Sequence, residues 1–369
     1  MEMSAAAGSL GMSGHRQRSV KRRRWGGLRQ QWKLLGLFEI DQQHEFYSLT
    51  CMMKEGLAAA TQNTIDNAPA NELSDDDFRL KVTQIHKDFT METFAGPVFS
   101  SLRGSLGMTE QEYQQSLCSE NCYLQFISNS KSKADFFLTN DKRFFLKTQN
   151  KREIKFLLSN LKIYMEHLRK YPHSLLKYFI VMQSVFYPDD RIIARYDIKG
   201  CEVSRWTAPA PEGSQIIVVL KDLNFEGQSI TLDQQRPWLL RQVEIDTHFL
   251  RGLNVLDYSL LVAHQPLHHD ERHQSLSFHA EPGSDAAELP DFQAQNRRLL
   301  PNLKNPLHII DGPEQRYFIG IIDIFTVYSF KKRLEHLWKR LRHPGRSFST
   351  VSPQTYCLRL SHWVQDHTK

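Results

Sequence analysis

Apolar residues in the first third of the chain recur at helical spacing. Residues 46–65 follow this spacing, and residues 67–77 form a polar break that contains proline. Residues 94–118 carry the spacing again over two stretches that meet at Gly107. In the second stretch Thr109 stands three positions before a glutamate, as in a capping box. We therefore predict one leading helix, followed by two helices joined around Gly107.

Short segments rich in aromatic and branched residues follow, separated by turn residues. Between the segments at residues 144–147 and 178–186, the spacing predicts a helix over residues 153–168, and Pro172 ends it. The first three form a predicted β-meander. The expected strands are residues 123–127, 136–139, 144–147, 178–186 and 191–196.

The second half has a longer helical pattern and two continuous apolar runs. Residues 237–253 predict a helix, and residues 255–263 and 318–325 are typical of buried strands. Residues 265–315 are rich in His, Pro, Asn and Asp, and predict a mobile insertion. Because sheet and helix come in runs and not in alternating βαβ units, the predicted fold class is α+β, mainly antiparallel sheet with packed helices.

The composition is that of a globular protein. Of 369 residues, 40% are apolar and 24% are charged, which predicts a packed core. Five cysteines form no disulfide ladder, so a reducing compartment is expected. No stretch reaches the roughly 18 apolar residues of a membrane span, and no secretory signal is recognised. Residues 1–33 are small and then Arg-rich, and predict a disordered basic tail.

Charge is distributed unevenly along the chain. The net charge is +6, yet residues 16–33 hold eight Lys/Arg and no acid, and residues 331–346 hold seven Lys/Arg and one glutamate. The rest of the chain is therefore acidic. This pattern favours a polyanionic partner such as anionic lipid, nucleic acid or an acidic protein. The alternative is two solvated charge runs without a partner.

Three charged residues stand in apolar surroundings. Lys147 ends a predicted strand, where an ammonium group can reach phosphate oxygens. Asp257 and Asp323 lie within the two predicted buried strands, where an ionised carboxylate is costly unless it is paired or bound to a metal. The alternatives are a surface lysine with a buried stem and two structural salt bridges.

Four segments together resemble the phosphatidylinositol phosphate kinases. The likeness runs from about residue 46 to the C-terminus, and the order and spacing of the segments match that family. It implies a two-lobed, protein-kinase-like fold that uses ATP and Mg²⁺, with an N-terminal lobe over residues 34–186 and a C-terminal lobe over residues 187–369. The segments are residues 144–148, 196–200, 256–262, and 320–323 followed by 331–336.

The resemblance also implies roles for single residues at the reaction centre. Lys147 would contact ATP, Asp257 would be the catalytic-loop aspartate and Asp323 would bind magnesium. Asp197 and Lys199 would face the phosphates.

Further residues are implied to handle the lipid. Arg205 would bind the headgroup, and Glu335 would favour phosphatidylinositol 4-phosphate over the 5-phosphate isomer, beside Lys331 and Lys332. Residues 338–353 would form an activation loop that docks on anionic membranes. The protein would then be cytoplasmic and peripheral at membranes, and would dimerise with itself or with type I phosphatidylinositol 4-phosphate 5-kinases.

Nucleic acid is not an expected partner, because the sequence offers no aromatic stacking platform.

The expected phosphate loop departs from the family pattern. Residues 128–135 contain no glycine, although backbone amides approach phosphate most closely where no Cβ intervenes. Ser132 and Lys133 in this loop would contact the nucleotide, and Lys155 stands where related kinases carry a glutamate, leaving Glu153 as a substitute partner for the lysine of the ATP site. Weak ATP binding is therefore expected.

Two functions follow from these features. The first is a kinase-shaped scaffold with weak or absent activity, which localises or regulates active type I kinases. The second is a fully competent ATP-dependent phosphatidylinositol 4-phosphate 5-kinase. The expected catalytic residues favour the enzyme, and the glycine-free loop favours the scaffold.

Overall fold

The computed structural model describes residues 36–67, 73–127, 134–171, 174–175, 181–186, 191–211, 217–268 and 309–369. The predicted basic tail lies outside these residues, as do residues 128–133 of the phosphate loop and residues 269–308 of the insertion. Two compact units divide the chain, one of Met1–Ser128 with Glu212–Ile217 and one of Asn129–Pro211 with Val218–Lys369. The predicted lobe boundary after residue 186 stays a prediction.

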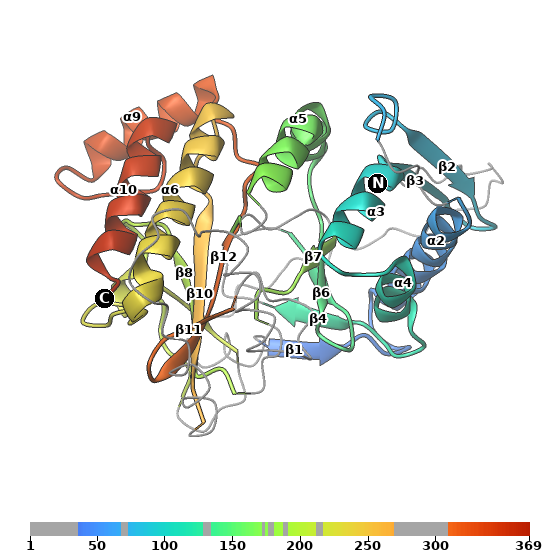
Figure 1. The fold of residues 1–369 in the computed structure, drawn as a ribbon, viewed down its shortest axis with the longest axis horizontal. Helices are drawn as coiled ribbons and strands as arrows, with labels where there is room; N and C mark the ends of the chain where they lie inside the picture. The colour runs from blue at the N-terminus through green and yellow to red at the C-terminus, as the bar shows by residue number, and fades with distance from the viewer. Residues whose placement is uncertain are drawn as a thin grey trace, which may run out of the picture. The chain divides into compact units, whose positions relative to one another are not determined.

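In its described residues, the first unit combines three helices with two pairs of antiparallel strands (Figure 1). Both predicted helices around Gly107 are present, and Thr109 forms a complete capping box with Glu112 at the start of the second. The hairpin β2–β3 was not predicted, because its strands are short and only half-buried. The elements are β1 (Gly36–Glu39), α2 (Tyr47–Asp66), β2 (Lys81–Ile85), β3 (Thr90–Phe94), α3 (Gly96–Ser105), α4 (Glu110–Cys118) and β4 (Leu124–Ile127).

The second unit begins with three antiparallel strands and a long helix. Strands β5 (Phe136–Leu138) and β6 (Phe144–Lys147) form the hairpin expected of the meander, and β7 (Val181–Gln183) pairs with β6. Helix α5 (Lys151–Lys170) starts at an Asn150 capping box and buries one apolar stripe. The stripe consists of Leu157, Leu161, Tyr164, Met165 and Leu168.

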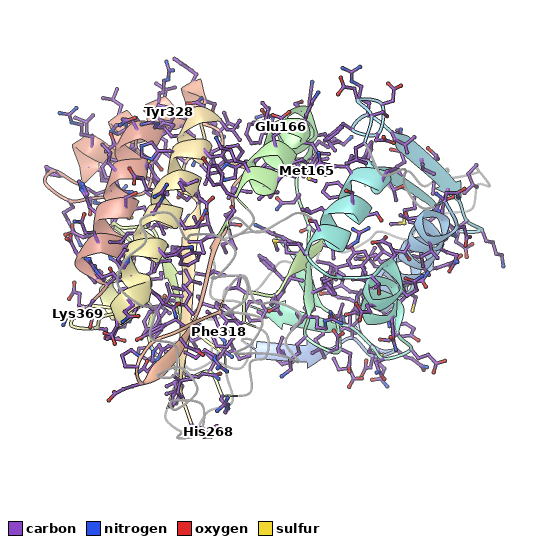
Figure 2. The ribbon with its side chains drawn as sticks, in the orientation of Figure 1. Met165, Glu166, His268, Phe318, Tyr328 and Lys369 are labelled. Carbon is purple, nitrogen blue, oxygen red and sulfur yellow. The ribbon has the colours of Figure 1, made fainter. Side chains whose placement is uncertain are left out.

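A second sheet, with five strands in the order β11-β12-β10-β8-β9, lies in the same unit. Its pairs are antiparallel except β8 with β9, which is parallel. Phe318, labelled in Figure 2, lies in its buried core against Val185, Ala263 and Ile309. The strands are β8 (Ala194–Ile198), β9 (Val219–Lys221), β10 (Ser259–Pro266), β11 (Ile309–Asp311) and β12 (Gln315–Ile322).

Three helices complete the described part of the second unit, with two short 3₁₀ turns at Asp222–Asn224 and Asp233–Gln235. The predicted helix near residues 237–253 is α6 (Arg236–Gly252), and it packs against α10 (Pro353–Asp366) (Figure 1). Helix α9 (Phe330–Arg342) buries none of its residues. No helix in the described ranges is long and apolar enough to cross a bilayer.

The observed strand ends correct two expectations. Strand β10 begins at Ser259 and runs to Pro266, and β11 already starts at Ile309, so ordered sheet occupies both ends of the predicted insertion 265–315. Strand β12 ends at Ile322. Asp257 and Asp323 therefore lie in turns beside the strands, and not within them as their apolar neighbours indicated.

Candidate active site

Asp257 and Asp323 lie at the same end of one sheet because of the register between β10 and β12. Ser259 of β10 pairs with Ile322 of β12, so Asp257, two residues before the first strand, and Asp323, one residue after the second, lie at the same end of the pair. Both have positive φ, 65° and 61°. Aspartate adopts this left-handed conformation more readily than bulky residues, and such strained positions concentrate at functional sites. The two aspartates thus lie just outside the strands, at the same end of the pair.

Asp323 pairs with the lysine at the end of β6. Lys147 Nζ donates to Asp323 Oδ1 at 2.5 Å, and the ammonium group also lies 5.4 Å from the centre of the Phe136 ring. The Lys147 side chain is only 10% exposed, whereas that of Asp323 is 40% exposed. The lysine is therefore held in place, and the carboxylate is still open to a ligand.

Asp257 pairs with Lys199, which directly follows β8. Lys199 Nζ donates to the Asp257 carboxylate at 2.9 Å and to its backbone oxygen, and Gly200 with φ 64° turns the chain immediately afterwards. Burial alone would raise the pKa of Asp257, but Lys199 and Lys332 lower it. Burial alone would lower the pKa of Lys199, but Asp257, Asp197 and Asp323 raise it overall. Both groups are therefore charged at neutral pH.

Arg205 joins two further aspartates. Its Nε donates to Asp222 Oδ2 at 2.6 Å, and its Nη2 donates to Asp197 Oδ1 at 2.7 Å and to the Asp197 backbone oxygen. Asp222 also accepts from the backbone amides of Lys199 and Cys201. Burial alone would raise the pKa of Asp197, but Arg205 and then Lys199 hold it below its usual value. The headgroup role expected for Arg205 stays a prediction.

The sequence analysis missed Asp222 as a site residue. Its side chain is 5% exposed and accepts three hydrogen bonds, so it fixes the turn that carries Lys199. The one available signal was an acid between Lys221 and the apolar residues Leu223 and Phe225, where a buried carboxylate has to be paired.

A second charged group surrounds Glu335 on α9. Its carboxylate accepts from Thr350 Oγ1 at 2.8 Å and pairs with Lys339 at 2.7 Å and Lys332 at 3.0 Å. Burial alone would raise the pKa of Glu335, but the hydrogen bonds from Lys339, Lys332 and Thr350 lower it to about 2. Lys332 also lies 3.7 Å from Asp257 Oδ2, which connects this group to the first one.

Lys331 and one face of α9 are exposed. Lys331 lies in the first turn of α9, and the predicted activation loop 338–353 begins within the last turns of that helix, which ends at Arg342. Five large apolar side chains of α9 fall on one face at helical spacing, each more than half exposed. They are Phe330, Leu334, Leu337, Trp338 and Leu341.

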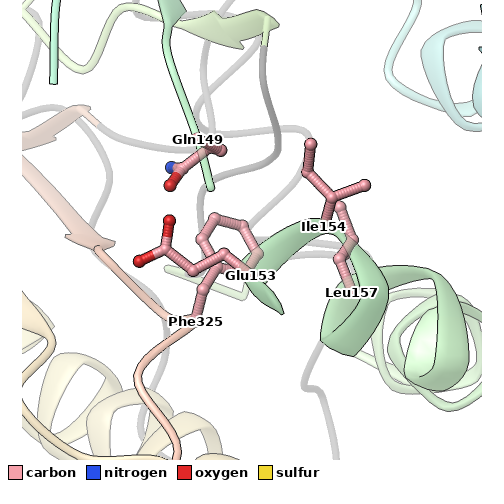
Figure 3. Close-up of a pocket in the computed structure, with 5 residues that line it drawn as sticks. All are labelled: Gln149, Glu153, Ile154, Leu157 and Phe325. Atoms are coloured by element: carbon pink, nitrogen blue, oxygen red, sulfur yellow. The ribbon is translucent and has the colours of Figure 1, made fainter. Parts of the chain in front are cut away.

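Glu153 has a different partner from the expected one. Its carboxylate accepts from the Asn150 amide at 3.2 Å in the cap of α5. It also lines a small hollow with Gln149, Ile154, Leu157 and Phe325 (Figure 3). The hollow measures about 170 Å³ even when the part open to solvent is included, which is less than the roughly 300 Å³ at the lower end of ligand pockets. Because Glu153 accepts a hydrogen bond in the cap and Lys147 pairs with Asp323, we assign Glu153 to the helix cap.

The residues brought together fit a nucleotide with magnesium. Lys147 and Lys199 are cations suited to phosphate, and Asp323 is an exposed carboxylate. Within the described ranges no cluster of three or more potential metal ligands occurs. Magnesium is usually bound by one or two carboxylates together with substrate phosphates, and Asp323 would be the residue to hold it here. Ser132 and Lys133, the remaining predicted nucleotide contacts, lie outside the described residues.

Cations and carboxylates gathered at one place are what phosphoryl transfer requires, and Lys147, Lys199, Asp257 and Asp323 provide them. The chain belongs to the phosphatidylinositol-4-phosphate 5-kinase family, whose model matches residues 117–367. The family predicted from the four sequence segments is thereby confirmed. Membership implies that ATP and a phosphoinositide are the family's substrates.

Comparison with individual proteins narrows the relationship. The chain is 56% identical to phosphatidylinositol 4-phosphate 5-kinase-like protein 1 of Homo sapiens, over 93% of this chain and 92% of that protein. It is 51% identical to the Mus musculus protein of the same name, over 93% and 91%. Identity to phosphatidylinositol 4-phosphate 5-kinase 9 of Arabidopsis thaliana is 28%, over 76% of this chain and 44% of that protein.

Proposed function

We propose that this protein binds phosphatidylinositol 4-phosphate at cytosolic membrane surfaces and supports formation of phosphatidylinositol 4,5-bisphosphate, with weak or absent kinase activity of its own. In this role it localises or regulates active type I 5-kinases, by pairing with them. The observation that carries the proposal is a contrast within one site. Its charged residues are assembled, but the segment expected to hold the nucleotide phosphates has no glycine in residues 128–135.

Weak nucleotide binding follows from this contrast. A loop without glycine keeps Cβ atoms between its amides and a phosphate, and it lacks residues that adopt positive φ without strain. Lys147 and Lys199 are already neutralised by Asp323 and Asp257, so a triphosphate competes with both carboxylates. Magnesium held by Asp323 would neutralise phosphate charge during transfer. ATP affinity is thus expected to be lower than in relatives with a glycine-containing loop.

Membrane binding is supported by α9. One face of this helix exposes apolar side chains, and seven Lys/Arg lie between residues 331 and 346. A helix with a large apolar face and basic flanks is suited to the headgroup region of an anionic bilayer. Each basic residue near such a surface contributes about 1 kcal/mol.

A competent kinase is the second candidate. Specific support comes from Asp257, whose lowered pKa keeps it ionised beside Lys199 and Lys332. An ionised carboxylate in that place can accept the proton of an attacking hydroxyl.

One assay separates the two candidates. Purified full-length protein is incubated with labelled ATP, Mg²⁺ and vesicles containing phosphatidylinositol 4-phosphate, beside the Lys147→Met variant and the surface control Lys170→Met. The proposal expects wild type to form little more product than Lys147→Met, yet to bind the vesicles as well as both variants do. Product that depends on Lys147 and accumulates at the rate of an active type I kinase would establish the competent enzyme. Failure of all three proteins to bind the vesicles would refute both candidates.

A further inference from the structure

The segment between α9 and α10 contacts several parts of the candidate site through four consecutive residues, Ser347 to Thr350. The backbone oxygen of Ser347 accepts from the amides of Glu202 and Val203 at 3.1 and 2.9 Å. The backbone oxygen of Phe348 accepts from Arg359, whose guanidinium also reaches the backbone oxygen of Lys199. The segment is therefore fastened to the turn that carries Lys199.

The next two residues reach the two carboxylates of the site. Ser349 lies close to Asp257 and helps to lower the pKa of that carboxyl group. Thr350, which is 0% exposed, donates from Oγ1 to Glu335 Oε1 at 2.8 Å and accepts from Lys339 Nζ at 2.8 Å. Lys332 closes the circuit from the other side, since it lies 3.0 Å from Glu335 and 3.7 Å from Asp257.

The Thr350 side chain is fully buried, so an apolar side chain of the same shape would fill its space equally well. The hydroxyl therefore matters for the hydrogen bonds that it makes. A valine of nearly the same shape would fill the space, but it would leave Glu335 Oε1 and Lys339 without their bridging hydroxyl. The hydroxyl fixes both the position of the Glu335 carboxylate and the lysine that neutralises it. Where a carboxylate such as that of Glu335 distinguishes ligands by its charge, its fixed position determines which headgroup phosphate comes close to it.

We propose that Thr350 is a positioning residue for phosphoinositide selectivity, holding Glu335 in the conformation that distinguishes the two monophosphate isomers. Lys332 lies against both Glu335 and Asp257, so the two carboxylates share one cation. The inference rests on the proposed function, and on the isomer preference that the resemblance to the kinase family implies for Glu335. The contact itself is testable without lipid.

The lipid experiment measures binding of the full chain to phosphatidylcholine vesicles that carry the 4-phosphate isomer, the 5-phosphate isomer or phosphatidylserine at matched surface charge. We expect Thr350→Val to lower the preference for the 4-phosphate isomer by about tenfold, in line with a hydrogen bond to a charged group. Thr350→Ser, which keeps the hydroxyl, should retain the preference. Binding to phosphatidylserine should be the same in all three proteins. The control Thr247→Val removes an equally buried hydroxyl from α6 and should leave selectivity unchanged.

The contact is tested by a double-mutant cycle of unfolding free energies with Thr350→Val and Glu335→Ala. Non-additive losses are expected, because each substitution removes the same hydrogen bond. Additive losses, or equal loss of selectivity in Thr350→Val and Thr350→Ser, would overturn the inference and leave the proposed function intact. A wild type without any isomer preference would instead refute the lipid choice in the proposed function, and the selectivity role of Thr350 with it.

Discussion

At the scale of single residues, the positive and negative side chains of the site neutralise one another in ion pairs. Lys147 pairs with Asp323, Lys199 with Asp257, and Arg205 with both Asp197 and Asp222. Two of these three arrangements include an aspartate that is at least 24% exposed beside a mostly buried lysine. Ligands at this site therefore exchange one ion pair for another and do not meet unpaired charges.

Arg205 should be required for stability. Its side chain is 9% exposed and forks between two carboxylates, one of them 5% exposed, and a lysine cannot reproduce that geometry. We expect Arg205→Lys to lower the free energy of unfolding by about 2 kcal/mol or more. Chemical denaturation measures the change, with Arg152→Lys on the exposed face of α5 as control. Equal stability of the two variants would mean that the fork contributes nothing.

Glu335 should make stability depend on acid pH. Its pKa is about 2 in the folded chain against a usual value of 4.5. The unfolded chain therefore binds a proton first as the pH falls, so the contribution of Glu335 is complete above pH 4.5 and is lost as the pH falls towards 2. The difference in unfolding free energy between wild type and Glu335→Gln should shrink over that window. A difference that stays constant with pH would contradict the lowered pKa.

Residue-scale predictions from sequence had a clear limit. Lys147, Asp257 and Asp323 were singled out because a charge among apolar residues needs a partner, and the structure brings all three to one site. Thr350 was missed because its neighbours gave no reason to expect a buried hydroxyl. Partners so distant in the chain follow from tertiary packing, which local pattern does not encode.

At the scale of elements, the strongly periodic segments were predicted best. Helix α5, helix α6 and the capping box at Thr109 are present as expected, because amphipathic spacing and cap chemistry are local properties. Strand ends were predicted less well. Apolar runs continued past Ser259 and Ile322 into the turns, since residues next to the sheet are buried as well. Helix α10 was missed although Ser352 caps it and Pro353 begins it.

The exposed face of α9 leads to a prediction for the helix as a unit. Replacing Leu337 and Trp338 by serine should weaken binding to anionic vesicles at least tenfold, because burying each such side chain contributes about 2 kcal/mol. Stability should change little, since neither side chain is buried in the protein. Vesicle co-sedimentation and thermal unfolding measure the two effects. The matched control is Ile163→Ser, a 47% exposed residue of α5.

Loss of vesicle binding in the Ile163 variant, or none in the α9 variant, would show that α9 is not the membrane-facing helix.

The basic residues of α9 do not all serve the same purpose. Lys339 pairs with Glu335 and Thr350, and Arg342 stacks over Trp338 at 5.0 Å. Arg340 and Arg346 are the exposed choices for testing charge alone.

At the scale of the whole molecule, charge is segregated along the chain. Residues 16–33 and 331–346 each carry a large net positive charge, whereas the rest of the chain is net acidic. Attachment to anionic vesicles should therefore weaken as salt shortens the Debye length. Deleting residues 1–33 should weaken attachment to any anionic vesicle alike, whereas Arg340→Ala with Arg346→Ala should reduce phosphoinositide binding more. Co-sedimentation at low and physiological salt measures both, and identical salt curves for all proteins would contradict this division.

The distance along the chain between the paired residues has a consequence for biosynthesis. Lys147 and Asp323 are 176 residues apart, so at usual rates of about 5–20 residues per second the lysine leaves the ribosome roughly 10 to 35 s before its partner exists. Glu335 and Thr350 are made later still. Throughout that interval the nascent chain exposes strands whose partners have not yet been made. It also exposes a lysine that is buried and paired only in the folded protein. Incomplete translation products should consequently depend on chaperones and be degraded, and the amount of functional protein in a cell would be set by how many ribosomes reach the last helix.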